Sequence, residues 1–180
     1  MKTTERILII TELAIKDANI GKTAMMKFLY LLQTLYAVPL GYDFQIYTYG
    51  PYSQAVMSDI ELADYWGDII ISPIQYPNGM NGYNIIPTDE GKMHVSKERA
   101  AIDPYNDAIK NIIKYFSDKT AKELELDSTL VFVSNSYNQN GWNNSKDEIC
   151  SAVKQIKPHF SDDDISCAYS CLLSNGYINH

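Results

Sequence analysis

The sequence lacks positive charge over a long central span, because no lysine or arginine occurs between Lys27 and Lys92. The whole chain of 180 residues carries 15 lysine and arginine residues against 22 aspartate and glutamate residues, a net charge of -7. Binding to a polyanion requires clustered cations, so this balance disfavours nucleic acids and anionic membrane surfaces as partners. The hydrophobic content of 46% is sufficient for one domain, or for a domain with a smaller appendage.

Cysteine and long apolar runs are scarce as well. The three cysteines, Cys150, Cys167 and Cys171, form an odd and sparse set, which favours reduced packing thiols over a disulfide framework. No apolar run approaches the roughly 20 residues of a membrane helix. The apolar residues 7–10 are bracketed by charges, and no small-residue cleavage site follows them. We therefore expect a soluble, cytoplasmic protein with no membrane segment.

Patterns that carry known chemistry are missing too. The segment Gly21–Thr23 resembles the end of a phosphate-binding loop, but Lys16 occupies the position where that loop requires its first glycine. Cys167 and Cys171 share a predicted helical face, yet no second cysteine or histidine pair near them completes a tetrahedral zinc set. No serine or cysteine is matched with a histidine in a recognisable catalytic pattern. We expect no cofactor, no metal and no enzymatic activity.

Hydrophobic spacing and capping residues predict a mostly helical chain. The predicted helices cover residues 3–17, 22–36, 53–65, 89 onward, 104–116, 121–135, 145–156 and 162–174. Their expected N-caps include Ser53, Thr88, Thr120, Ser145 and Ser161. Residues 128–134 have an ambiguous period and leave a strand as the alternative, but helix is favoured because no turn separates them from the helical residues before them. A polar loop is predicted over residues 135–145.

Two β-rich regions interrupt the helices. Residues 42–50 alternate as a short strand that stops at Gly50-Pro51, which are the predicted structural turn. Residues 69–76 and 82–86 are predicted to pair as a hairpin, joined by the turn-forming residues 77–81.

The order of the predicted elements is that of a winged helix: three helices, a hairpin and a further helix. We expect a mainly α fold with a small β-hairpin, an α+β fold. The predicted domains are a winged-helix-like core over residues 1–100, with the hairpin as its wing, and a helical C-terminal region over residues 101–180 packed on it. A single domain is the alternative. In this order the helix over residues 53–65 takes the place of the DNA-recognition helix.

The charge of that helix argues against DNA. It carries Asp59, Glu61 and Asp64, and both it and the wing fall within the span that has no cations. Phosphate groups would repel such a helix, so nucleic acid binding through residues 53–65 is disfavoured. The alternative is a winged-helix DNA-binding transcriptional regulator that uses cations outside this span. Those cations are Lys2, Arg6, Lys16 and Lys22, or Lys92, Lys97 and Arg99.

Tyrosine is abundant where cations are missing. The chain has 14 tyrosines, and most of them lie between Lys27 and Lys92. Tyrosine combines a large contact area with a polar tip and is enriched at protein interfaces, although any single one is equally compatible with a position at the edge of the core. We predict a surface for a protein partner that includes Tyr30, Gln33, Tyr47, Tyr49, Tyr52, Ser53 and Asp59.

Two segments, GKTAMMKFLYLLQ and LGYDFQIYTYGPYSQAVMSDIELA, resemble the YwgA-like family of uncharacterised bacterial and phage-associated proteins. More distantly, they resemble the Panacea, or SocA-like, domain. In both families a helix with a Lys-x-x-Tyr-Leu core precedes a Tyr-Gly-Pro turn that opens a second helix. The matching residues here are Lys27, Tyr30, Leu31 and Gln33, followed by Tyr49, Gly50, Pro51, Tyr52 and Ser53. The match covers residues 21–63, and Tyr52 stands where Panacea domains usually have valine.

Panacea-type domains are known chiefly as antitoxins that neutralise diverse toxins carried on the same operon, and as partners of proteolytic adaptors. The resemblance therefore implies a non-catalytic, protein-binding role in toxin control, phage defence or stress. It implies a protein partner encoded nearby, such as a toxin or a defence component, and it brings no catalytic residues. A homo-oligomer is compatible with the same prediction.

Overall fold

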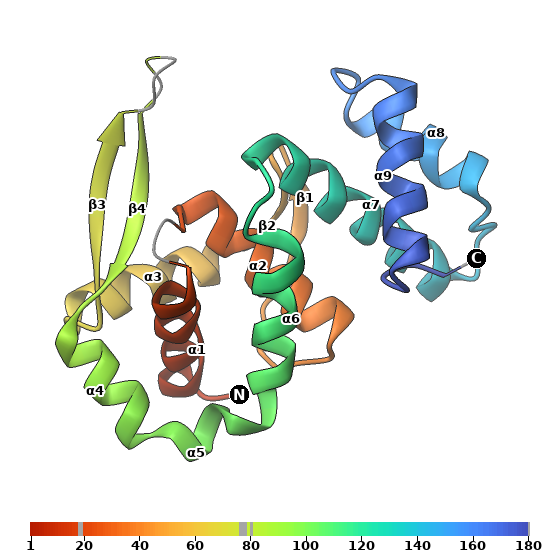
Figure 1. The fold of residues 1–180 in the computed structure, drawn as a ribbon. Coiled ribbons are helices and arrows are strands. Elements are labelled where there is room, and N and C mark those ends of the chain that lie inside the picture. The colour runs from red at the N-terminus through yellow and green to blue at the C-terminus, as the bar shows by residue number, and fades with distance from the viewer. Residues whose placement is uncertain (18–19, 76–78, 80, 180) are drawn as a thin grey trace. The chain divides into compact units, whose positions relative to one another are not determined.

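The computed structural model describes residues 1–17, 20–75, 79 and 81–179. It is mainly helical, with two small antiparallel sheets of two strands each, so the prediction of an α+β fold is confirmed (Figure 1). The chain forms two compact units. The first comprises Met1–Phe44 and Tyr52–Lys119, and the second comprises Gln45–Pro51 and Thr120–His180.

The first unit has the element order of a winged helix. Its elements are α1 (Thr3–Lys16), α2 (Lys22–Leu35), α3 (Gln54–Tyr65), β3 (Ile69–Gln75), β4 (Asn81–Pro87), α4 (Asp89–Lys97), α5 (Arg99–Ile102), the 3-10 helix η1 (Asp103–Tyr105) and α6 (Asn106–Phe116). The β3–β4 hairpin extends from the end of α3 and the start of α4 (Figure 1). The predicted turn at 77–81 falls mostly outside the described residues.

The core of the first unit is built on α1 and α2. Apolar residues surround most of α2, which is buried over eight consecutive residues, Met25 to Leu32. The apolar face of α6 contributes Ile109, Ile112 and Phe116, and α6 packs against both α1 and α2. For this reason the first unit continues to Lys119, beyond the domain boundary predicted after residue 100.

The wing is fixed to the core through β4. Strands β3 and β4 pair from Ile69↔Pro87 to Gln75↔Asn81. The amide of Ile85 donates to the carbonyl of Ile20 at 2.9 Å, and a single bridge joins Gly21 to Asn84. Ile20 and Gly21, just before α2, therefore pair with the outer edge of β4.

A junction of backbone contacts holds α3, the wing and α4 together. The Thr88 amide donates to the Asp68 carbonyl at 3.1 Å, and the Thr88 hydroxyl accepts from the Gly91 amide at 2.9 Å, the N-cap that the sequence predicts. The Asp68 carboxylate lies 2.8 Å from His94 Nδ1. Gly67 ends α3 with a φ of 79°. The orientation of the wing is therefore set by contacts at its base.

The second unit comprises a short hairpin and three helices. Its elements are β1 (Gln45–Tyr47), β2 (Gly50–Tyr52, whose last residue belongs to the first unit), α7 (Ala121–Asn140), α8 (Lys146–Ile156) and α9 (Asp162–Ser174). Residues 128–134 lie within α7, so helix is confirmed there and the strand alternative is wrong. The core side chains of the helices are Leu124, Leu130, Ile149, Val153, Ile165 and Tyr169.

Two sequence predictions are corrected in the second unit. The turn of the first hairpin lies at Thr48 and Tyr49, and Gly50-Pro51 begin the returning strand, so the single strand over 42–50 and the turn at Gly50-Pro51 are wrong. The polar residues 135–140 continue α7 instead of forming a loop, and Gly141 ends that helix with a φ of 66°. In both cases a glycine with positive φ marks the true boundary.

The helix caps allow a matched test. The Thr120 hydroxyl accepts from the Glu123 amide at 3.2 Å and forms a capping box, whereas Ser145 occupies the N-cap of α8 without a side-chain hydrogen bond to that helix. We expect Thr120→Ala to lower the free energy of unfolding by about 1 kcal/mol. The Ser145→Ala control should change it by less than about 0.5 kcal/mol. Urea unfolding followed by circular dichroism measures both, and equal losses would contradict the assignment of the caps.

Candidate functional site

Three of the residues predicted to contact a partner are buried. Tyr30 packs its ring edge-on against Phe44, with the ring centroids 5.1 Å apart, and burial raises the pKa of its hydroxyl. Ser53 lies at the N-cap of α3 without capping it through its side chain, and its amide lies 3.4 Å from the sulfur of Met26. Asp59 is also buried. The partner-contact prediction is corrected for these residues because their side chains are inaccessible.

Gln33 and Tyr52 have local structural roles. The amide group of Gln33 accepts from the Tyr42 amide and donates to the Tyr42 carbonyl, both at 2.9 Å. This two-way contact fixes the segment that leaves α2. The Tyr52 hydroxyl donates to Gln54 Oε1 at 2.7 Å, and the Tyr52 side chain is half-buried. Only Tyr47 and Tyr49 of the predicted residues present most of their side chains to solvent, with 68% and 66% exposed.

Asp59 joins α3 to α1 through a buried ionic cluster. Its Oδ2 atom lies 2.6 Å from Arg6 Nε and accepts from the Tyr42 hydroxyl at 2.8 Å. The guanidinium group of Arg6 also lies 5.0 Å from the centre of the Tyr42 ring. The bond to Asp59 raises the pKa of Arg6, and burial followed by the same bond raises that of Tyr42. The charge of Asp59 is therefore compensated inside the first unit.

Asp59 lies on the buried side of α3, and the opposite side of this helix is exposed to solvent. The exposed residues follow helical spacing and are Gln54, Ala55, Ser58, Glu61, Asp64 and Tyr65. Tyr65 is 85% exposed, and Trp66 follows it at the end of the helix with 44% exposed. Two large aromatic side chains thus lie in solvent at the position of a recognition helix.

The wing that follows α3 in the chain exposes an apolar pair of its own. Ile70 and Ile86 are cross-strand partners and so point to the same face, where they are 54% and 42% exposed. Their neighbours Ile69 and Ile85 point to the opposite face and are buried. Asp64 connects the two parts, because its Oδ1 accepts from the Ile71 amide at 2.8 Å. We call the set Glu61, Asp64, Tyr65, Trp66, Ile70 and Ile86 the α3–wing surface.

The free edge of the wing is poorly suited to pairing with another strand. In an antiparallel pair, alternate residues direct their backbone groups away from the partner strand. On β3 these include Ile71, whose amide is taken by Asp64, and Pro73, which has no amide hydrogen. On β4 the amide of Ile85 is taken by Ile20. The edges of the wing therefore offer few backbone groups to an added strand.

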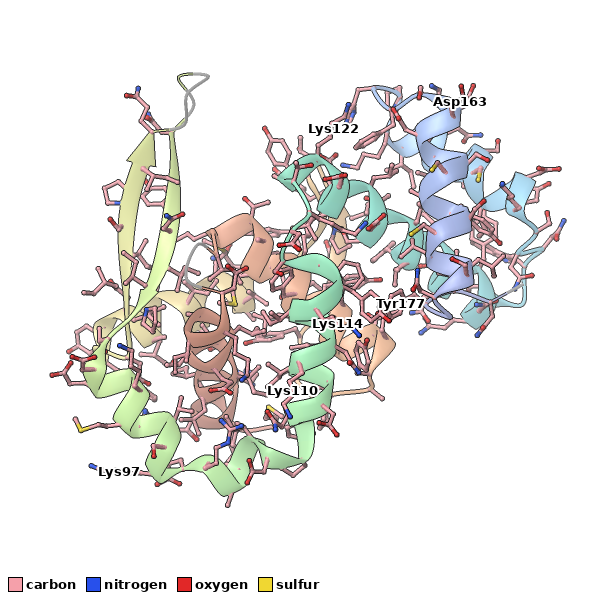
Figure 2. All side chains as sticks on the ribbon, in the orientation of Figure 1. Lys97, Lys110, Lys114, Lys122, Asp163 and Tyr177 are labelled. Atoms are coloured by element: carbon pink, nitrogen blue, oxygen red, sulfur yellow. The ribbon has the colours of Figure 1, made fainter. Side chains whose placement is uncertain are left out.

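Most cations proposed for a DNA-binding face are paired within the chain. Arg6 pairs with Asp59, Lys92 lies 2.9 Å from Asp89, and the buried Glu12 pairs with both Lys16 at 3.1 Å and Arg99 at 2.9 Å. Lys22 lies 4.9 Å above the ring of Tyr83. Lys97 lies at the end of α4, and Lys110 and Lys114 lie along α6 (Figure 2). These intramolecular pairs weaken the electrostatic basis for a phosphate-binding face.

A buried lysine in the second unit holds the first hairpin in place. Lys157 Nζ lies 2.8 Å from Glu125 Oε1 and donates to the carbonyls of Tyr47, at 3.1 Å, and Thr48. His159 Nε2 lies 3.5 Å from the same Glu125 oxygen. The lysine side chain is only 2% exposed. We call this arrangement the Lys157 clasp.

The hairpin also approaches α7 closely at Gly50. A Cβ atom on Gly50 would lie 3.1 Å from Ser128 Oγ and 3.2 Å from Thr129 Oγ1, and the φ of Gly50 is +89°. Both the space and the backbone conformation therefore require glycine. With the Lys157 clasp, this contact fixes the turn that displays Tyr47 and Tyr49.

In the part of the chain that the structure covers, groups that could bind a metal ion or react as a nucleophile are the remaining candidates for a reaction centre. Among the residues that the structure describes, no group of three His, Cys, Asp or Glu side chains is arranged to hold a metal ion. A cleft of about 410 Å³ lies between α8 and α9, but Lys146 donates to Ser170 Oγ at 3.1 Å and Lys154 to the Phe160 carbonyl at 2.7 Å. Burial raises the pKa of the Cys150 thiol in this cleft, which lowers its reactivity at neutral pH.

The structure also bears on two further predictions, the role of the cysteines and the absence of a membrane segment. Cys167 and Cys171 are exposed, so the prediction that they are packing thiols is wrong. Within the described ranges, no helix has both the length and the hydropathy that a membrane span requires.

No protein-family model matches the sequence, and no curated protein matches it significantly. The resemblance to YwgA-like and Panacea-type proteins therefore stays a prediction.

Proposed function

We propose that this chain is a non-catalytic protein-binding module that contacts its partner through the α3–wing surface. The observation that carries the proposal is the exposure of Tyr65, Trp66, Ile70 and Ile86 around one junction of the fold. When a partner covers large apolar side chains, their burial favours binding by about 25 cal/mol per Å² of apolar area. Tyrosine and tryptophan are also the residue types that contribute most often to binding hot spots.

The negative charge of the same surface supports a protein partner over DNA. Glu61 and Asp64 lie on the exposed part of α3, and the sequence supplies no lysine or arginine between Lys27 and Lys92. A duplex placed against α3 would meet uncompensated carboxylates and would release few counterions.

The second candidate function is a winged-helix DNA-binding regulator, which the element order of the first unit favours. It predicts that the chain shifts its own promoter DNA in a gel and that the shift weakens as salt rises. We expect no shift at low ionic strength. A salt-dependent shift with promoter DNA would favour the regulator over the protein-binding module.

We further propose that the module acts in the cytoplasm as an antitoxin, or as a related phage-defence or stress component. The resemblance of residues 21–63 to Panacea-type domains supports this role. The partner would then be a toxin or defence protein encoded next to it. Co-expression with the products of the adjacent genes should give a stable complex on affinity purification and should restore growth that the neighbouring product inhibits. If no product of an adjacent gene copurifies and none is neutralised, the antitoxin role is wrong.

A further inference from the structure

We infer that the segment which binds the α3–wing surface is cationic, with lysine or arginine beside aliphatic or aromatic side chains. This inference rests on the proposed protein-binding function and specifies the chemistry of the partner. It follows from the sign of the charge that surrounds the exposed apolar residues and from the absence of cations among them.

Carboxylates border the apolar side chains on more than one side. Glu61 lies one helical turn before Tyr65 on the exposed face of α3, and no cation among the described residues pairs with it. Asp64 touches the edge of β3. Glu90, in the first turn of α4, is exposed four residues after Ile86 in the chain. The charged side chains next to the apolar residues along α3 and at the start of α4 are therefore carboxylates.

Lys22 and Lys92, two cations of the first unit, have other contacts within the chain. Lys92 is paired with Asp89 at 2.9 Å. Lys22 lies over the ring of Tyr83, a residue that points to the face of the wing opposite Ile86, because residues 83 and 86 have opposite parity along β4. A cation on the partner can therefore pair with Glu61 without competing with these lysines.

Other occupants are disfavoured by the same charges. A second copy of this chain would bring equivalent carboxylates together, and like charges across an interface oppose association. A wholly apolar segment would remove water from Glu61 and Asp64 without replacing it, which is costly for ionised groups. A lysine- or arginine-bearing segment satisfies the carboxylates and can also place its cations over the exposed rings of Tyr65 and Trp66.

The inference is tested by selecting random 12-residue peptides, displayed on phage, against the immobilised full-length chain. We expect the enriched peptides to carry net positive charge and at least one large apolar residue. Their synthetic counterparts should bind the double variant Glu61→Gln and Asp64→Asn about five- to tenfold more weakly than the unmodified chain. Their affinity should also fall as sodium chloride is raised, because exposed charge pairs are screened.

A matched control separates local charge from net charge. The double variant Asp43→Asn and Asp118→Asn removes the same number of exposed carboxylates from elsewhere in the first unit and should leave peptide affinity within about twofold of the original. Circular dichroism of all variants verifies that they remain folded.

The outcomes distinguish this inference from the proposed function. Neutral or acidic peptides that need Tyr65 and Ile86 would overturn the cationic partner and leave the protein-binding surface intact. Failure to enrich any peptide that depends on Tyr65 and Ile86 would overturn both. Dimerisation in analytical ultracentrifugation that Ile86→Ala abolishes would assign the surface to a second copy and would also contradict the inference.

Discussion

Gly91→Ala is expected to lower the free energy of unfolding by about 3 kcal/mol or more. A Cβ atom at this position would lie 2.0 Å from the carbonyl oxygen of Asp68 and 2.8 Å from its carbonyl carbon. Both contacts involve backbone, so a side-chain rotation cannot relieve them. Because Thr88 donates its amide to the same carbonyl, either the first turn of α4 or the end of α3 must move.

Gly67→Ala is the matched control for this prediction. Gly67 belongs to the same junction and has a φ of +79°, but a Cβ atom added there would meet no other atom within 4 Å. Gly67→Ala should therefore lower the free energy of unfolding by about 1 kcal/mol, because alanine is strained at a positive φ. Thermal and urea unfolding of the two variants measure the difference, and an equal or smaller loss for Gly91→Ala would show that the junction is not tightly packed.

Lys157→Met is expected to lower the free energy of unfolding by about 3–5 kcal/mol, because it leaves the buried Glu125 carboxylate without its cation. It also removes the donor for the carbonyls of Tyr47 and Thr48. We expect the backbone amides of residues 45–52 to exchange with deuterium faster in this variant, since the clasp holds their hairpin.

Two controls accompany the lysine variant. Lys154→Met removes a partly exposed lysine from the last turn of α8, where it donates to the Phe160 carbonyl, and should lower the free energy of unfolding by about 1 kcal/mol. Adding Glu125→Leu to Lys157→Met removes the stranded carboxylate and should restore part of the loss. Unchanged exchange over residues 45–52 in Lys157→Met would contradict the role of the clasp.

Local sequence signals predict the helices well. The buried stripe of α2 and the caps Thr88, Thr120 and Ser161 are all found as the sequence indicates, since they depend on residues only a few positions apart. The end of α7 is missed, because polar residues beyond a core continue the helix until Gly141 ends it. The first hairpin is missed because its turn is fixed by Lys157 and α7, far along the chain.

The candidate site depends more strongly on tertiary contacts. Asp59 looks like a surface acid on α3, but Arg6 from α1 buries and compensates it. No local pattern marks Lys157 as a core residue. The exposure of Ile70 and Ile86 could be predicted from the sequence. Side chains alternate between the two faces of a strand, so once Ile69 and Ile85 are buried, their neighbours lie on the exposed face.

The most direct measurement is the amount of a co-expressed protein, encoded by an adjacent gene, that copurifies with each of two double variants of this chain. Tyr65→Ala with Ile86→Ala removes exposed apolar side chains from the α3–wing surface, while Tyr115→Ala with Ile156→Ala removes exposed apolar side chains elsewhere. The predicted result is a loss of bound partner of about tenfold or more for the first pair, with unchanged thermal unfolding, and full retention for the second. Full retention by the first pair, with loss by the second, would contradict the α3–wing surface as the binding site.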